Sequence, residues 1–343
     1  MKKRFLALGL ILTLALSLLA GCSGGGAASS GAGASSGAGA SGGASSGTPS
    51  GGEGKRMAIC LPLRDQFITI VEDLTREELE KLGYTVDSFE AQGDVNTQIS
   101  QVAGCANAGY DGIMVMVNDL DSTTALMDAA GDVPIIFYQR GADYEAIKGR
   151  SIYIGCNQEE LGQLQADYLT NWAKEQGMDT INLVFFLGTL GNDPTTRRTN
   201  AFKAGMEASG LTVNYVFEDT ADWDRAKAMD KFMQFLNTGT AFDAVVCNND
   251  DMALGVIEAY KSLGQDVPVP ILGIDATEMA LQAIKEGTMT FTGSQNAELI
   301  ASESVRAADE YVRTGSAEGV DENGLLMLPP IGIDASNVDE YLN

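Results

Sequence analysis

The stretch "DAVVCNNDDMALGVIEAYKSLGQDVPVPILGID", residues 243–275, decides the fold class. An apolar run at 243–248 is followed by a helical pattern at 251–264 that ends on Gly264, and a second apolar run follows at 269–275. Glycine in that position is typical of a helix C-terminus. Apolar runs separated by a helix predict parallel strands with helices on both faces of the sheet.

The same alternation extends outward along the chain in both directions. Strand-like runs are expected at 57–63, 84–90, 112–118, 133–139, 151–156, 181–188, 211–218, 243–248, 269–275 and 290–295. Because these runs exceed one ordinary sheet, we predict an α/β protein with two doubly wound parallel-sheet lobes. The longest polar stretch between two strands, 138–151, is where we expect the first lobe to end.

The N-terminus has the pattern of an export signal. Three basic residues at 2–4 precede an apolar run at 5–20, and "LAGC" follows at 19–22. A single membrane span is the alternative, but about 16 apolar residues fall short of the roughly 20 that a bilayer requires. The order resembles the lipobox of bacterial lipoproteins. It therefore predicts a signal peptide over 1–22 and a lipid on Cys22.

Residues 23–54 are almost wholly Gly, Ser and Ala and predict a flexible tether. The net charge of the chain is −25, and removing the three basic residues at 2–4 gives −28. A surface this acidic repels nucleic acid and anionic lipid headgroups. We expect an exported protein that handles neutral or cationic small molecules.

Cysteine and histidine usage narrows the chemistry further. Cys60, Cys105, Cys156 and Cys247 contain no close-spaced pair, which favours buried free thiols over zinc ligands or disulfides. The chain has no histidine, which excludes Ser-His-Asp and Cys-His nucleophiles and argues against zinc catalysis. No cofactor is expected.

Polar and aromatic side chains follow almost every expected strand. In open parallel sheets, ligands bind beyond the carboxyl ends of the strands. The side chains in question are Asp65, Phe67, Asn118, Asp121, Gln139, Arg140, Asn192, Asp193, Arg198, Trp223, Asn249, Asp250, Asp275 and Gln295. Amides, carboxylates, guanidinium groups and flat rings suit a polyhydroxylated ligand.

The two aromatic candidates differ in how well the pattern supports them. Trp223 lies roughly 115–120° from the centre of the apolar stripe of the helix that follows it, taking about 100° per residue. It is therefore predicted to face a cleft and not the core. Phe67 shares a face with Ile70, Val71 and Leu74, so a core role explains it at least as well.

Helix capping is an alternative role for several of the carboxylates and amides. Asp65, Asn249 and Asp275 each sit where a helix begins, and an N-cap explains each of them without a ligand. The two roles can coexist in one side chain. Asp250 is the better cap of its pair with Asn249, and Asp121 is a better cap than a ligand contact.

The adjacent residues Arg197 and Arg198 should point in different directions from the same helix. One of the two is expected to face the cleft and the other to face solvent. The register of the expected helix favours Arg198 for the cleft.

Four segments carry a resemblance to a known family. They are "DTADWDRAKAMDKF", "VVCNNDDMALGVIEA", "ILGIDATEMALQAIKEG" and "LPPIGID". They resemble the galactose/glucose-binding proteins of bacterial sugar ABC transporters, which are type I periplasmic sugar-binding proteins related to the ribose-binding proteins. The resemblance implies two lobes joined by three crossings that close as a hinge on one sugar. It implies an N-terminal lobe of 57–138 plus 296–328 and a C-terminal lobe of 139–295 plus 329–343.

The resemblance also implies a set of ligand contacts. The matching positions are Asp65, Phe67, Asn118, Arg198, Trp223, Asn249 and Asp275, with Gln295 where the galactose/glucose branch has Asn. The branch's His-Pro-Asp is replaced by Asn192, Asp193 and Pro194, so Asn192 and Asp193 are expected to supply different hydroxyl contacts. Arg140 and Gln295 are more similar to the ribose-binding branch. The calcium loop of the branch lacks its ligand series here, so no metal is expected.

The function expected from these residues is that of a receptor. Phe67 and Trp223 would hold a pyranose ring between them, with D-galactose or D-glucose first among the candidates. Ribose, xylose or arabinose, or a role in chemotaxis or signalling, remains an alternative. A glycosidase is the competing class, and a sugar-responsive repressor would need a DNA-binding headpiece and a basic surface. We expect a monomer, lipid-anchored through Cys22 outside the cytoplasmic membrane, with an ABC permease and its ATPase as partners.

Overall fold

The computed structural model describes residue 52 and residues 54–342. The signal peptide, the lipidation of Cys22 and nearly all of the tether lie outside the described residues. The described residues belong to one compact unit. No helix within them combines the length and the apolar character needed to cross a membrane.

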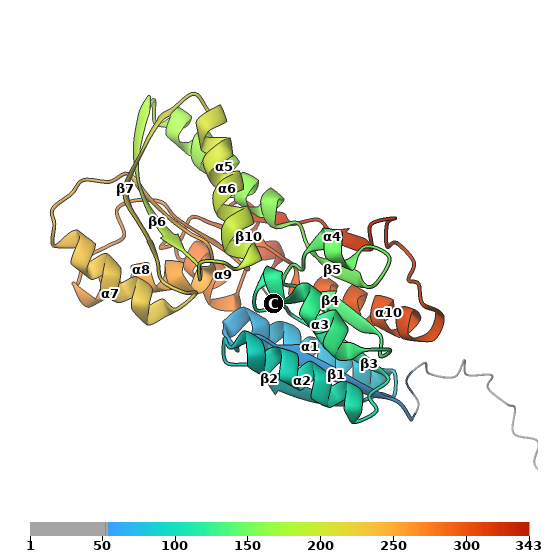
Figure 1. Cartoon of the computed structure of the whole chain (residues 1–343). Helices are drawn as coiled ribbons and strands as arrows, with labels where there is room; N and C mark the ends of the chain where they lie inside the picture. Colours follow the sequence, from blue (N-terminus) through green and yellow to red (C-terminus); the bar gives the residue numbers. More distant parts are fainter. Residues whose placement is uncertain (1–51, 53, 343) are drawn as a thin grey trace, which may run out of the picture. The chain divides into compact units, whose positions relative to one another are not determined.

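The first sheet has six parallel strands in the order β11-β5-β4-β3-β1-β2 (Figure 1). The strands are β1 (Arg56–Leu61), β2 (Thr85–Glu90), β3 (Gly112–Val115), β4 (Ile135–Tyr138), β5 (Ile152–Cys156) and β11 (Leu325–Leu328). Its helical segments are α1 (Gln66–Lys81), α2 (Val95–Asn107), η1 (Leu120–Ser122), α3 (Thr123–Ala130), α4 (Tyr144–Ile147) and α10 (Ala297–Thr314). Helix α10 packs beside α1, although the two are far apart in sequence.

Both faces of the first sheet are buried, which explains why its strands have no polar alternation. In β1, Met57, Ile59 and Leu61 pack into a cluster with α1 and α10. The intervening Ala58 and Cys60 pack into a second cluster with α2 and α3. Because strand side chains alternate between faces, a strand covered on both sides is apolar at every position.

The second sheet has the order β12-β10-β9-β8-β6-β7, and only β12 runs antiparallel to its neighbour. Its strands are β6 (Thr180–Leu187), β7 (Thr212–Thr220), β8 (Ala244–Cys247), β9 (Ile271–Ile274), β10 (Phe291–Ser294) and β12 (Ile331–Asp334). Its helices are α5 (Gln158–Glu175), α6 (Asp193–Ala208), α7 (Arg225–Leu236), α8 (Asp250–Ser262), α9 (Glu278–Lys285) and η2 (Val338–Glu340).

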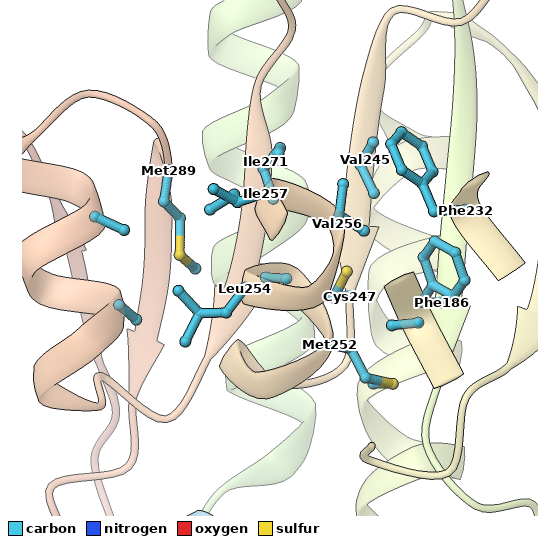
Figure 2. Packing of buried hydrophobic residues seen from close by; sticks show 14 of the residues in the cluster. Phe186, Phe232, Val245, Cys247, Met252, Leu254, Val256, Ile257, Ile271 and Met289 are labelled. Carbon is cyan, nitrogen blue, oxygen red and sulfur yellow. The ribbon is translucent and has the colours of Figure 1, made fainter. Parts of the chain in front are cut away.

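The stretch 243–275 forms the β8–α8–β9 unit at the centre of this sheet. Figure 2 shows Val245 of β8 and Ile271 of β9 on the face that α8 covers, with Val256 of α8 packed between strand and helix. Phe232 of α7 extends the same cluster. Full burial of such a side chain stabilises the fold by about 1.5–3 kcal/mol. The expectation of two α/β lobes with parallel sheets is confirmed.

Three short crossings join the lobes. They lie at residue 157, at 295–296 and at 329–330, between strands or helices that belong to different sheets. We call the part that carries the first sheet the first lobe and the part that carries the second sheet the second lobe.

The expected end of the first lobe at residue 138 was wrong. Strand β5 pairs with β4 and β11 in the first sheet, so the chain changes lobe only after Cys156. The polar stretch that suggested the boundary is a loop with the short helix α4 inside the first lobe. Strands β11 and β12, which two prolines separate, were not expected either.

The four cysteines of the described chain are buried and free, as their spacing predicted. Three of them lie in strands, and Cys105 lies in α2.

Candidate functional site

Side chains from both lobes line one pocket where the strands of the two sheets end. The lining residues are Asp65, Phe67, Ile68, Gln139, Arg140, Pro194, Arg198, Trp223, Asn249, Asp275 and Gln295. Most of the residues expected to contact a ligand are therefore brought together. Asn118, Asn192 and Asp193 are not among them.

Asp65 has two roles in the structure. It is the N-cap of α1, where its Oδ1 accepts a hydrogen bond from the Ile68 backbone N–H at 2.7 Å. Its Oδ2 lies 3.7 Å from Nη2 of Arg140. Burial raises the pKa of Asp65, and the Arg140 charge opposes that rise. One carboxylate oxygen thus caps the N-terminus of α1, while the other faces Arg140 at the pocket.

The pair Gln139–Arg140 follows β4 and enters the pocket with unused hydrogen-bonding capacity. Gln139 has a φ of 60°, in the left-handed region that is uncommon for residues other than glycine. Both side chains are almost fully buried, and within the described chain Gln139 Oε1 and Arg140 Nη1 have no hydrogen-bond partner. A buried unsatisfied polar atom costs about 1–3 kcal/mol. Gln139 was not among the expected contacts, although its position after a strand pointed to it.

Arg198 is fixed by two hydrogen bonds inside the second lobe. Its Nε donates to Gln158 Oε1 at 2.7 Å, and its Nη1 donates to the Asn248 carbonyl oxygen at 2.7 Å. Arg198 is 2% exposed, and burial lowers the pKa of its guanidinium group. Arg197 instead pairs with Asp193 and with Glu159 nearer the surface. Arg198 therefore lies at the pocket as expected, but the expectation that Arg197 faces solvent was wrong, because its side chain is half-buried beside Asp193 and Tyr144.

Two glutamines connect Arg198 to Asp275. Gln158 Nε2 donates to Gln295 Oε1 at 3.1 Å, and Gln295 Nε2 donates to Asp275 Oδ1 at 2.8 Å. Asp275 Oδ1 in turn lies 3.8 Å from Arg198 Nη1. Gln158 follows the first crossing and Gln295 lies in the second, so this network ties pocket residues to the hinge. Gln158, in the first turn of α5, was not among the expected site residues.

Three of the expected helix caps, Asp275, Asp121 and Asp250, were wrong. Thr277, not Asp275, caps α9. The Asp275 side chain is almost fully buried at the pocket, and burial raises its pKa well above the usual value, against the opposing charge of Arg198. Asp119, not Asp121, is the capping residue of the turn after β3, and Asp121 is exposed.

Asn249 is the cap of α8, and Asp250 has a different role. Asn249 Oδ1 accepts from the Met252 backbone N–H at 3.0 Å. Asp250 is fully buried and accepts hydrogen bonds from Thr292 Oγ1 at 2.7 Å and from the Thr277 N–H at 2.9 Å. Burial raises the pKa of Asp250 to about 6. The prediction that Asp250 would cap the helix was therefore wrong.

Trp223 lines the pocket and also packs against the core. It is 5% exposed and belongs to the hydrophobic cluster of the second lobe. Its φ of 68° and the φ of 56° at Asp222 place both in a left-handed turn before α7. The guanidinium carbons of Arg140 and Arg198 lie 5.9 and 5.8 Å from the ring centroid, within the range of cation–π attraction. The expectation that the ring would avoid the core was therefore only half right.

Phe67 likewise has both of the roles that its pattern allowed. It is 6% exposed, packs with Ile68 and Val71 in the first lobe, and lines the pocket.

The three expected contacts outside the pocket have other partners. Asn118 Nδ2 donates to the Gly93 carbonyl oxygen at 2.6 Å. Asn192 bonds to the Asn118 backbone and to Trp223, and Asp193 pairs with Arg197. Each of the three thus has at least one partner within the protein, although Asp193 Oδ2 is buried without a hydrogen-bond partner among the described residues.

The pocket suits a neutral ligand that carries several hydroxyl groups. Two carboxylates, Asp65 and Asp275, face two guanidinium groups, Arg140 and Arg198, so the formal charges cancel. Amides of Asn249 and Gln295 add both donors and acceptors, and two aromatic rings offer flat apolar faces. A net charged ligand would leave one member of this balanced set uncompensated.

Comparisons with known proteins agree with this architecture. A putative rhizopine-binding protein of Rhizobium meliloti is 31% identical over 245 residues, covering 68% of this chain and 76% of the relative. A D-galactose/methyl-galactoside-binding periplasmic protein of Haemophilus influenzae is 27% identical over 299 residues, covering 81% of this chain and 88% of the relative.

Among solved structures, an ABC transporter solute-binding protein of Bacillus halodurans with bound myo-inositol has a TM-score of 0.76 and 30% identity, covering 84% of this chain and 97% of that one. The family model for the periplasmic binding protein domain matches residues 58–316. The chain therefore belongs to the periplasmic binding protein family, and it is an extracytoplasmic binding protein rather than an enzyme.

Proposed function

We propose that this chain is the sugar receptor of an ABC importer and that it captures one neutral six-membered polyol ring between its lobes. The observation that carries the proposal is the charge-balanced pocket, to which both lobes contribute. A ligand that contacts both lobes binds better to the closed arrangement and so shifts the hinge toward closure. The permease of the importer would then take the ring from the closed receptor.

The hydrogen-bonding groups of the pocket would select the ring. Each net hydrogen bond contributes about 0.5–1.5 kcal/mol, whereas a buried group left unsatisfied costs about 1–3 kcal/mol. A ring that lacks one hydroxyl would leave a donor such as Arg140 Nη1 without a partner. Discrimination among similar rings therefore depends more on unsatisfied groups than on added contacts.

D-Galactose or D-glucose is the first candidate ring. It is supported by the presence of both Phe67 and Trp223 in the pocket lining and by the similarity to the galactose-binding protein of Haemophilus influenzae. The second candidate is myo-inositol, which is favoured by the 30% identity to the Bacillus halodurans protein that holds it.

We also propose that the receptor acts as a monomer held at the outer face of the cytoplasmic membrane by a lipid on Cys22. The Gly/Ser/Ala-rich tether of residues 23–54 would give it a reach on the order of 30 Å, taking about 5–6 Å × √n. Labelling cells with a radioactive fatty acid would test the anchor. Label retained by a Cys22→Ser variant would contradict it.

The function itself is tested by thermal shift and titration calorimetry of the purified protein. The panel contains D-galactose, D-glucose, myo-inositol and D-ribose. A ligand that binds only the native state raises the melting temperature, so at least one six-membered ring should do so. Response to D-ribose alone would replace the proposed ring with a pentose. No response to any member would contradict the proposal.

A further inference from the structure

At the N-terminus of α6, Asn192 and Asp193 contact the other lobe and do not themselves line the pocket. Asn192 comes from the second lobe, and its Nδ2 donates to the backbone carbonyl oxygen of Asn118 in the first lobe at 2.7 Å. Asn192 is 7% exposed and Asn118 is 9% exposed. This buried hydrogen bond crosses the gap between lobes without involving a ligand.

The other half of the Asn192 amide holds the pocket tryptophan. Asn192 Oδ1 accepts a hydrogen bond from Trp223 Nε1 at 3.3 Å. One side chain therefore connects the indole ring to the opposite lobe. Rotation of the Asn192 amide would break both hydrogen bonds together.

Two more contacts join the same helix end to the first lobe. Gly141 approaches Asp193 so closely that a Cβ at residue 141 would stand 2.2 Å from Asp193 Oδ2. The guanidinium carbon of Arg197 lies 4.8 Å from the ring centroid of Tyr144 in α4. Asn192, Asp193 and Arg197 thus form one closely fitted face, which we call the α6 latch.

We propose that Asn192 is a positioning residue that couples the orientation of Trp223 to closure of the lobes, and that the α6 latch stabilises the closed state for every ligand alike. The inference rests on the proposed function and deepens it. Contacts between residues on different lobes break when a hinge opens, so the latch exists only in the closed arrangement. Asn192 then acts through Trp223 and Asn118, not through the ligand.

A latch and a ligand contact have different consequences for selectivity. The affinity of a ligand for a closing protein includes the fraction of protein that can adopt the closed state, and this factor is the same for every ligand. A direct hydrogen bond strengthens only the ligands that carry the matching hydroxyl. The ratio of affinities within a panel therefore separates the two roles.

The decisive variant is Asn192→Asp. It keeps an acceptor for Trp223 Nε1 but replaces the donor to Asn118 with a carboxylate oxygen, and aspartate is also a favourable N-cap for α6. We expect the affinity for each ring that the wild type binds to fall by the same factor, about tenfold. Asn200→Asp makes the same chemical change at an exposed position of α6 and should leave every affinity unchanged.

Small-angle X-ray scattering supplies a readout that needs no ligand. Without added sugar, Asn192→Asp should have a larger radius of gyration than the wild type and than Asn200→Asp. Gly141→Ala should have the same effect from the other lobe, because the new Cβ pushes Asp193 away. The Gly141→Ala variant therefore still tests the latch if Asn192→Asp folds poorly.

Several results would overturn the proposal. A loss of affinity confined to some rings would make Asn192 a direct contact, and an unchanged scattering profile in both variants would remove the latch. If the wild type binds no member of the panel, the proposed function fails, while the scattering comparison still decides on the latch.

Discussion

The indole ring of Trp223 lies against the backbone of Gly188. A Cβ at residue 188 would stand 2.1 Å from Cζ2 of the indole, far inside van der Waals contact. Gly188 follows β6 directly, and its backbone N–H donates to Asn248 Oδ1 at 3.1 Å, which fixes it in place. The position of the pocket tryptophan therefore depends on the absence of a side chain at the end of a neighbouring strand.

Gly188→Ala should weaken ring binding by at least tenfold, because the added methyl group has to displace the indole from the pocket wall. Titration calorimetry against the ring that the wild type binds measures the effect. The matched control is Gly104→Ala in α2, where a new Cβ meets no atom within 4 Å. Equal affinities in Gly188→Ala and the wild type would show that the ring position is irrelevant to binding.

Trp223→Ala should also lower the affinity by at least tenfold, and here the fold should lose stability as well. Removing a buried tryptophan from a hydrophobic cluster costs about 3–5 kcal/mol. Trp223→Phe is the milder variant, since it keeps an aromatic ring while it loses the Nε1 donor and part of the indole surface. Trp172→Phe, in the second lobe but away from the pocket, is the control. A Trp223→Ala protein with wild-type affinity would exclude the indole from ligand contact.

The fold was predictable wherever burial leaves a simple pattern. The β8–α8–β9 unit was evident because strands covered on both faces, such as β8, are apolar throughout. The lobe boundary was not, because β5 looks the same in either sheet. Which sheet a short apolar strand joins depends on long-range pairing, here with β4 and β11, and that pairing leaves no local signal.

Site residues were predictable where their position after the end of a strand is enough to place them in the pocket. Asp65, Arg198 and Asp275 follow strands and lie in the pocket as expected. The roles of Asn192 and Gln158 were not predictable, because an amide bonds equally well to a ligand, a backbone or another amide. Only the three-dimensional partners of each amide assign its role.

Gln158→Met tests the link from pocket to hinge. Methionine is similar in size but cannot accept the Arg198 Nε hydrogen bond, so a buried guanidinium loses a partner. We expect at least tenfold weaker binding, together with a loss of stability of about 1–3 kcal/mol. Gln163→Met on the exposed side of α5 is the control. If only stability changes and affinity does not, Gln158 supports the fold without positioning Arg198.

Asp250 should make the stability of the protein fall as the pH rises from about 4 to about 6. Burial raises its folded-state pKa to about 6 from the usual 3.8, so the native state binds the proton more tightly than the unfolded state. The resulting stabilisation is complete at a pH below the unfolded-state pKa. It is lost as the pH rises through the folded-state pKa.

Asp250→Asn should remove that part of the pH dependence while keeping the fold. The asparagine oxygen can accept from the Thr277 N–H, and its amide can donate to the Thr292 hydroxyl, so both neighbours stay bonded. Melting temperatures at pH 4, 5, 6 and 7 measure the slope for both proteins. Asp251→Asn removes the same charge at a half-buried position one residue away and controls for net charge. Burial also raises the pKa of Asp275, so part of the slope should persist. Parallel curves for Asp250→Asn and the wild type would mean that Asp250 has the same pKa in the folded and unfolded states.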